Sequence, residues 1–120
     1  MSLALVAAIA IAGALGAALR YVVGERLARG TWLVNVTGSL ALGALVGTAT
    51  WLEMGEATML VVGGGLLGAY TTFSTWMIET LEMIERGRWR TAIGNLAWPV
   101  AAGLAAAAAG LGLARVVLGH

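Results

Sequence analysis

The amino-acid sequence predicts an all-α membrane protein with four transmembrane helices and a break in the third helix. Its 120 residues are 60% hydrophobic and only 11% charged, and the mean hydropathy is +0.90. The charged residues gather in short clusters, between which lie four charge-free runs at 2–19, 30–52, 57–78 and 91–114. Each run is at or near the ~20 residues that a helix needs to cross the hydrocarbon core. We therefore expect a single four-span domain in a lipid bilayer.

The first two spans are predicted at about 3–23 and 31–52. No positive charge precedes the first span, and its apolar stretch is longer than that of a signal peptide. We therefore interpret it as a helix that stays in the membrane. Arg20 and Tyr21 stand near its end, as expected of anchors at the membrane interface. Thr31 is the expected N-cap of the second helix.

The third span, at about 57–84, contains the sequence GAYTTFSTW at 68–76, and we expect its helix to break near 68–75. Small residues relax the backbone, and side-chain hydroxyls can cover carbonyls that leave the helical hydrogen-bond ladder. Non-helical backbone at membrane depth is tolerated only where protein or a water-filled cavity surrounds it. The break is therefore expected to lie in polar surroundings inside the assembled protein.

The fourth span, at about 89–117, contains Asn95 and Pro99. Pro99 has no N–H, so it leaves the Asn95 carbonyl without its helical donor, and we expect a kink there. An asparagine amide has two donor hydrogens and an acceptor to satisfy. We therefore expect Asn95, like Asn35 in the second span, to line something polar. Serine and threonine hydroxyls have an alternative, because they can bond to the carbonyl four residues earlier.

Glycine is abundant, with 18 residues, and two pairs are spaced four apart: Gly43 with Gly47, and Gly64 with Gly68. Such pairs let helix backbones approach closely in lipid, so we interpret them as packing sites.

The composition excludes several kinds of site. The chain has no cysteine, which excludes disulfides and thiolate metal sites. A net charge of +1, without a basic patch on a soluble surface, predicts no nucleic-acid partner. An enzyme is not expected, because the sequence has no nucleophile–base pair and its single histidine is the terminal His120.

The break offers ligands for ions of either sign, and none of them is ionisable. Freed carbonyl oxygens are hard ligands that suit a small cation. Freed N–H groups, the asparagine amides and the positive ring edges of Phe73 and Trp76 suit a small anion.

Beyond these local patterns, the chain resembles the Fluc/CrcB family of fluoride channels over nearly its whole length. The residues that carry the resemblance are Gly13-x-x-Gly16-Ala-x-x-Arg20-Tyr21, Gly30-Thr-x-x-Val34-Asn35-x-x-Gly38-Ser39, Gly68-x-x-Thr71-Thr72-Phe73-Ser74-Thr75 with Glu79, and Glu-Arg-Gly-Arg at 85–88. The second and third of these motifs, at this spacing in a four-span chain, are the specific ones. Three positions depart from the family pattern. Trp76 stands where phenylalanine is frequent, and Asn95 and Pro99 stand where the family often has tyrosine and serine.

The resemblance implies an antiparallel dimer in the cell membrane, with two fluoride pores at the interface and a structural sodium ion at its centre. The backbone carbonyls of Gly68 and Thr71 match the family's sodium ligands. The positions that match pore-lining residues, or that would lie along the pore, are Asn35, Phe73, Thr75, Trp76, Glu79 and Asn95. Fluoride is small and strongly hydrated, so a selective path must replace its water with neutral donors, whereas fixed positive charge would bind it too tightly to conduct.

Two alternative functions are compatible with four short spans. The chain could be a non-conducting or half-pore subunit of a heteromeric fluoride channel. A small multidrug transporter would need a carboxylate within the membrane to exchange protons for cationic drugs. The first three spans contain no such group before Glu79, which lies near a helix end.

The arginine distribution predicts how the chain lies in the membrane. With four spans, the first and third loops share one side of the membrane, and the termini share the other side with the second loop. The first side carries Arg26, Arg29, Arg86, Arg88 and Arg90, with Arg20 at its edge, against Arg115 alone on the other. Because arginine-rich short loops stay inside, we expect the first and third loops to be cytoplasmic. An antiparallel homodimer needs the same chain to insert in both orientations, so its sequence should show little arginine bias. The strong bias of this chain therefore favours a paralogous partner of opposite orientation.

Overall fold

All the regular secondary structure in residues 1–119 is helical. The computed structural model describes residues 1–119, and His120 lies outside them. Its elements are α1 (Leu3–Arg26), α2 (Gly30–Trp51), α3 (Glu56–Thr58), η1 (Met59–Leu67), α4 (Gly68–Tyr70), α5 (Ser74–Glu85) and α6 (Trp89–Val117). Within residues 1–119, four helical segments are long and apolar enough to cross a membrane, and the third is the joined run Glu56–Glu85. The predicted all-α fold with four transmembrane helices is confirmed.

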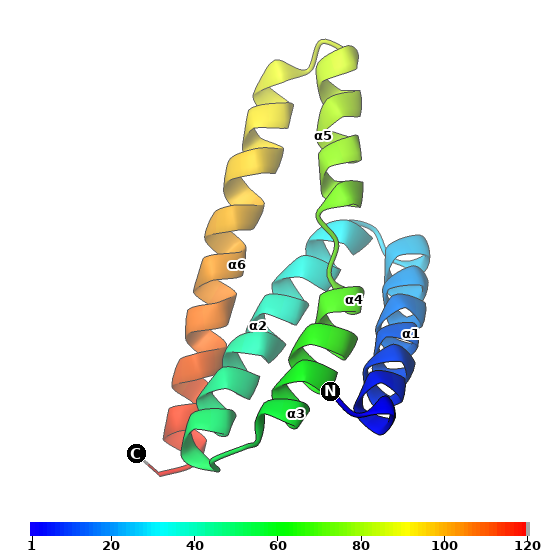
Figure 1. Cartoon of the computed structure of the whole chain (residues 1–120). Helices are drawn as coiled ribbons and strands as arrows, with labels where there is room; N and C mark the ends of the chain where they lie inside the picture. The colour runs from blue at the N-terminus through cyan, green and yellow to red at the C-terminus, as the bar shows by residue number, and fades with distance from the viewer. Residues whose placement is uncertain (120) are drawn as a thin grey trace.

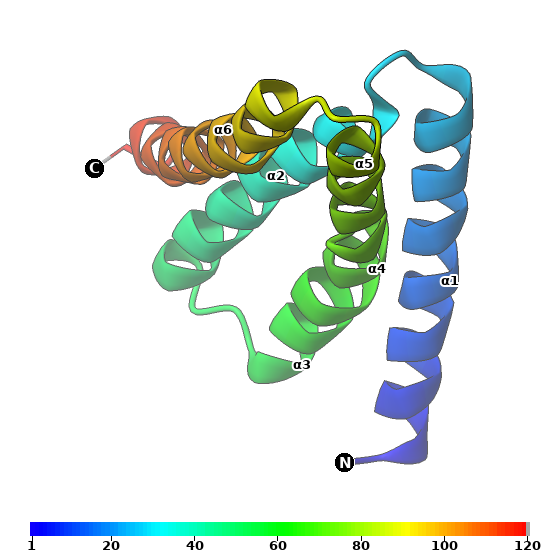
Figure 2. The same ribbon diagram turned by 90° about the horizontal axis from the view of Figure 1, so that it is seen from above.

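The helices alternate in direction, as Figure 1 shows. Both termini and the turn before α3 lie at one end of the molecule, and the α1–α2 and α5–α6 loops point toward the other end. Helix α2 lies along α6, while α1 lies along η1 and α4 (Figure 2). The hairpin of α5 and the first part of α6 rises beyond the α1–α2 loop. The two arginine-bearing loops therefore share one end, as the alternation of spans requires.

The third span is built from two unlike halves. Its first half, Met59–Leu67, is a π-helix that contains three consecutive glycines, and the Gly68 N–H donates to the carbonyl of Gly63, five residues back. Helices of this type are rare and are frequent at functional sites. The helix then opens at 71–73, where Thr71 is extended with φ −81° and ψ 161°. The predicted break is confirmed, and it is confined to three residues.

The expected N-cap at Thr31 is wrong. Helix α2 begins one residue earlier, at Gly30, and the N-cap position belongs to Arg29 in the left-handed region with φ 59° and without a side-chain cap. The chain turns so tightly here that a Cβ on Gly30 would lie only 2.5 Å from the Gly24 Cα. The Thr31 hydroxyl is already inside the helix and donates to Glu79 Oε1 at 2.6 Å instead.

Glycine packing is confirmed for one of the two pairs. Gly43 and Gly47 are buried where α2 meets α6, and a Cβ on Gly43 would overlap the Ala107 carbonyl. Gly110 fits α6 against the Leu40 carbonyl in the same way. Gly64, by contrast, faces open space within the described chain. The packing role predicted for the second pair is therefore not found between helices of one subunit.

Candidate ion-binding site

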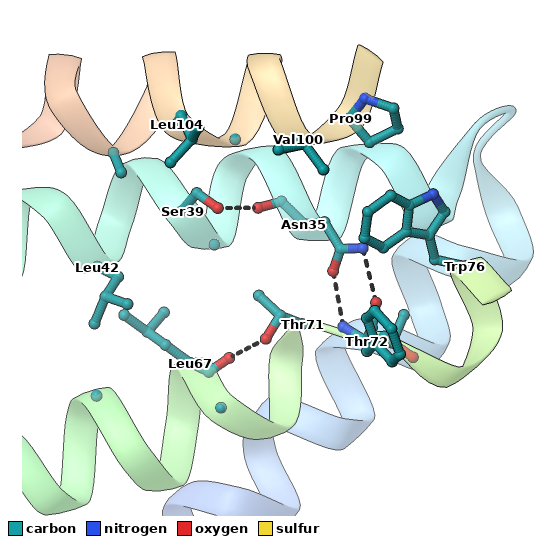
Figure 3. Close-up of a pocket in the computed structure, with 16 residues that line it drawn as sticks. Asn35, Ser39, Leu42, Leu67, Thr71, Thr72, Trp76, Pro99, Val100 and Leu104 are labelled. Atoms are coloured by element: carbon teal, nitrogen blue, oxygen red, sulfur yellow. Dashed lines mark hydrogen bonds between the residues drawn. The ribbon is translucent and has the colours of Figure 1, made fainter. Parts of the chain in front are cut away.

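The break in the third span is held in place by a side chain of α2. Asn35 Nδ2 donates to the Thr72 carbonyl at 2.8 Å, and the Thr72 N–H donates to Asn35 Oδ1 at 2.8 Å (Figure 3). One amide thus satisfies both backbone groups of Thr72, as a neighbouring strand would. The second hydrogen on Asn35 Nδ2 has no hydrogen-bond acceptor among residues 1–119. The polar partner predicted for Asn35 is the break itself.

Several carbonyls at the break lose their helical donors, and those of Gly68 and Thr71 are among them. In a continuous helix the Thr72 N–H would donate to Gly68, and the Thr75 N–H would donate to Thr71. The first bonds to Asn35 instead, and the second bonds to Thr72 Oγ1 at 3.3 Å. The carbonyls of Gly68 and Thr71, the two predicted sodium ligands, are therefore released from the helical ladder, as are those of Ala69 and Tyr70 between them.

Arg20 reaches the break from α1. Its Nη1 donates to the Thr71 carbonyl at 3.2 Å, and the contact is partly buried. A carbonyl oxygen has two lone pairs, so this bond leaves Thr71 one acceptor position. The sequence indicated only an interface anchor for Arg20, because nothing in its neighbourhood shows that it meets a residue 51 positions away.

A groove of about 460 Å³ brings five of the predicted site residues together. Its lining includes Asn35, Gly68, Thr71, Phe73 and Trp76. The rings of Phe73 and Trp76 meet edge to face, with centroids 5.7 Å apart. Phe73 is 69% exposed, so its ring lies on the surface of the subunit. The groove thus combines released carbonyls, an amide donor and aromatic edges on one surface.

A second groove, of about 730 Å³, continues from the first at Asn35, Trp76 and Pro99. Its lining includes Arg29 and Arg88, which directly precede α2 and α6. Among the predicted residues, Glu79 and Asn95 line this groove. The two grooves together therefore contain seven of the eight predicted site residues.

Thr75 is the one predicted site residue that lines neither of these two grooves. It lies in a smaller cavity of about 290 Å³ on the α1 side, together with Arg20, Thr31 and Glu79. Thr75 lies in the first turn of α5, whereas Phe73 precedes that helix and lines the first groove. The structure therefore pairs Thr75 with Glu79, as the spacing of four predicts, but not with Phe73.

Some hydroxyls in the spans bond within their own helix, and others bond to a polar group on another helix. Several bond to the carbonyl four residues earlier, including Ser39 to Asn35 at 2.7 Å and Thr71 to Leu67 at 3.1 Å. Thr31 instead joins α2 to Glu79 on α5, and Thr80 accepts from the Asn95 amide at 2.8 Å. These two partners were missed by reasoning from the sequence, because a hydroxyl shows no local sign of a distant partner.

The chain matches one protein family along most of its length. The family described as CrcB-like protein, Camphor Resistance (CrcB), matches residues 7–111. A protein of Chloroflexus aurantiacus named fluoride-specific ion channel FluC is 38% identical over 117 residues, covering 90% of this chain and 93% of that protein. The fluoride-specific ion channel FluC 1 of Symbiobacterium thermophilum is 41% identical over 117 residues, covering 88% of this chain and 93% of that protein. FluC 2 of Mycobacterium tuberculosis is 39% identical over 112 residues, covering 87% and 86%.

Proposed function

The chain belongs to the CrcB family, and on this premise we propose that it is a fluoride-selective channel that exports fluoride across the cell membrane. Its relatives are named as ion channels, so the chain is a channel subunit and not an enzyme. The pores are proposed to lie at the interface of an antiparallel dimer, with the lining predicted above.

The observation that carries the proposal is the composition of the groove beside the break. Its polar lining consists of an amide, hydroxyls and backbone groups, and the aromatic pair adds the positive edge of the outward-facing Phe73. The spare hydrogen of Asn35 Nδ2 is a neutral donor for an anion. The arginines Arg29 and Arg88 line the second groove and not the first. A small anion can therefore be drawn to the mouth by charge and lose its water among neutral donors.

Ion efflux from liposomes tests this function. The purified chain is reconstituted into fluoride-loaded and chloride-loaded vesicles. Chains purified in detergent can pair antiparallel before reconstitution, because no bilayer dictates their relative orientation. We expect fluoride efflux and almost no chloride efflux. A second arm adds a paralogous FluC subunit, and activity in that arm alone would identify a half-pore subunit. Chloride efflux equal to fluoride efflux, or no fluoride efflux in either arm, would contradict the proposal.

We also propose that the Gly68 and Thr71 carbonyls hold a structural sodium ion. Both have lost their helical donors, and both are neutral hard oxygen ligands without a carboxylate, which favours a monovalent ion over a divalent one. The ion would help to keep the breaks of two subunits together. We expect exchange of sodium for N-methylglucamine to lower both fluoride efflux and the thermal midpoint of the dimer, and calcium not to restore them. Unchanged efflux and midpoint after exhaustive exchange would rule out this role.

The arginine bias supports a fixed orientation in cells, with both arginine-bearing loops in the cytoplasm. We propose that the natural partner is then a paralogous subunit of opposite orientation, because identical chains can pair antiparallel only if the chain inserts into the membrane in both orientations. Reporter proteins fused to the C-terminus are expected to give an extracytoplasmic signal at least about tenfold above the cytoplasmic one. Changing Arg86, Arg88 and Arg90 together to glutamine should bring the two signals closer. Equal signals from the unchanged chain would favour a homodimer instead.

A further inference from the structure

Helix α6 carries a proline in the middle of a transmembrane segment. The helix nevertheless continues from Trp89 to Val117 through Pro99. Because Pro99 has no N–H, the carbonyl of Asn95, four residues earlier, cannot receive its helical hydrogen bond. Prolines are tolerated in membrane helices where neighbouring groups satisfy the freed carbonyl. The Asn95 carbonyl therefore needs a donor from outside α6.

Trp76 on α5 supplies that donor. Its indole Nε1–H donates to the Asn95 carbonyl oxygen at 2.5 Å. An indole has a single N–H and no acceptor, so this bond uses its entire hydrogen-bonding capacity. The N–H of Trp76 is thus turned toward α6, and the ring edge alone is left for the groove.

Two further bonds close the connection into a ring. The Asn95 side chain donates from Nδ2 to Thr80 Oγ1 at 2.8 Å, and the Thr80 hydroxyl donates to the Trp76 carbonyl at 2.9 Å. Thr80 is only 4% exposed, so water does not compete for these bonds. The α5 and α6 helices are therefore linked by side chains in both directions, one turn beyond the break.

We propose that Trp76 is a positioning residue whose indole replaces the backbone N–H missing at Pro99, and that this bond fixes α5 against α6 beside the break. Trp76 and Pro99 are then mutually dependent. Phenylalanine at position 76 leaves the Asn95 carbonyl unpaired, unless residue 99 regains its N–H. Because α5 starts at Ser74 and carries Trp76 against Phe73, the bond also sets the aromatic edges in the groove. This last consequence rests on the proposed channel function, whereas the bond itself does not.

A double-mutant cycle tests the dependence without any transport measurement. Trp76→Phe is expected to raise the unfolding equilibrium constant in detergent about tenfold, which is typical of a buried group left without its hydrogen bond. Adding Pro99→Ala should recover most of this loss, because the backbone N–H that alanine restores at position 99 can donate to the Asn95 carbonyl. Trp89→Phe, at a site 60% exposed on α6, is the matched control and should show no coupling to Pro99→Ala. Equal destabilisation of Trp76→Phe with and without Pro99→Ala would overturn the proposal.

Indole N–H resonances give a direct second measurement. Spectra of the ¹⁵N-labelled wild-type protein and of the Trp76→Phe variant identify the Trp76 signal by its loss. In the Pro99→Ala variant this proton should move upfield, because the restored backbone N–H competes for the same carbonyl. An unmoved signal would contradict the shared acceptor. Fluoride efflux should recover together with stability in the Trp76→Phe, Pro99→Ala double variant. A wild-type chain without fluoride efflux would count against the proposed function alone, since stability and resonances report the bond.

Discussion

Replacing Asn35 with alanine is expected to abolish fluoride efflux and to destabilise the fold strongly. The Asn35 amide is the hydrogen-bond partner of both backbone groups of Thr72, at 2.8 Å each. Alanine would leave a donor and an acceptor unpaired at a residue that is only 9% exposed. At about 2 kcal/mol for each unpaired group, the loss approaches 4 kcal/mol. This is a large part of the roughly 5–15 kcal/mol that holds a typical domain together.

Asn35→Asp separates the loss of the donor from the loss of shape. A carboxylate can still accept from the Thr72 N–H, but it brings a negative oxygen against the Thr72 carbonyl and offers no donor to an anion. We therefore expect intermediate stability and no fluoride efflux. Thr50→Val is the matched control on the same helix, since its hydroxyl bonds to the Val46 carbonyl within α2. Thermal unfolding and liposome efflux measure both effects. Wild-type efflux and midpoint in Asn35→Ala would show that the break does not depend on this amide.

Gly110→Ala is expected to prevent correct packing of α6 on α2. A Cβ at position 110 would overlap the Leu40 carbonyl oxygen and lie 2.8 Å from the Ala44 N. Both are backbone atoms, so relief requires the helices to separate along the main contact of the fold. Overpacking in cores typically costs about 1–3 kcal/mol, and more where backbones must move. The grooves between α2, α5 and α6 would also lose their shape.

Gly112→Ala is a matched control two residues further along the same helix. A Cβ there meets nothing within 4 Å in the described chain. Alanine favours a helix over glycine by about 1 kcal/mol, so this variant should be as stable as the wild type or more so. Elution from a sizing column and thermal unfolding in detergent distinguish the two variants. The α2–α6 contact would be looser than described if Gly110→Ala behaved like Gly112→Ala.

The spans and the break could be predicted because both depend on local composition. Four charge-free runs are enough to indicate four membrane helices, and the hydroxyl cluster after Gly68 indicates where one of them opens. The role of Asn35 followed from the cost of burying an amide.

Contacts between distant residues could not be predicted in this way. Arg20 meets Thr71 across 51 positions, and Thr31 meets Glu79 across 48. The sequence contains both the carbonyl orphaned by Pro99 and the indole that satisfies it, but no periodicity shows that they meet. The π-helix at Met59–Leu67 has no compositional signature either, because its glycines are equally compatible with ordinary close packing.

The wide turns of η1 bear on how chains of this kind change length during evolution. A helix with i→i+5 hydrogen bonds holds about one residue more per turn than an α-helix. Losing one residue between Met59 and Leu67 can therefore convert wide turns to ordinary ones, while the ends of the segment stay where they are. Asn35 holds the Thr72 end, so the length difference is absorbed before it reaches the break. A single-residue gap in this stretch, when related sequences are aligned, then marks a change of helix type and not a rebuilt ion site.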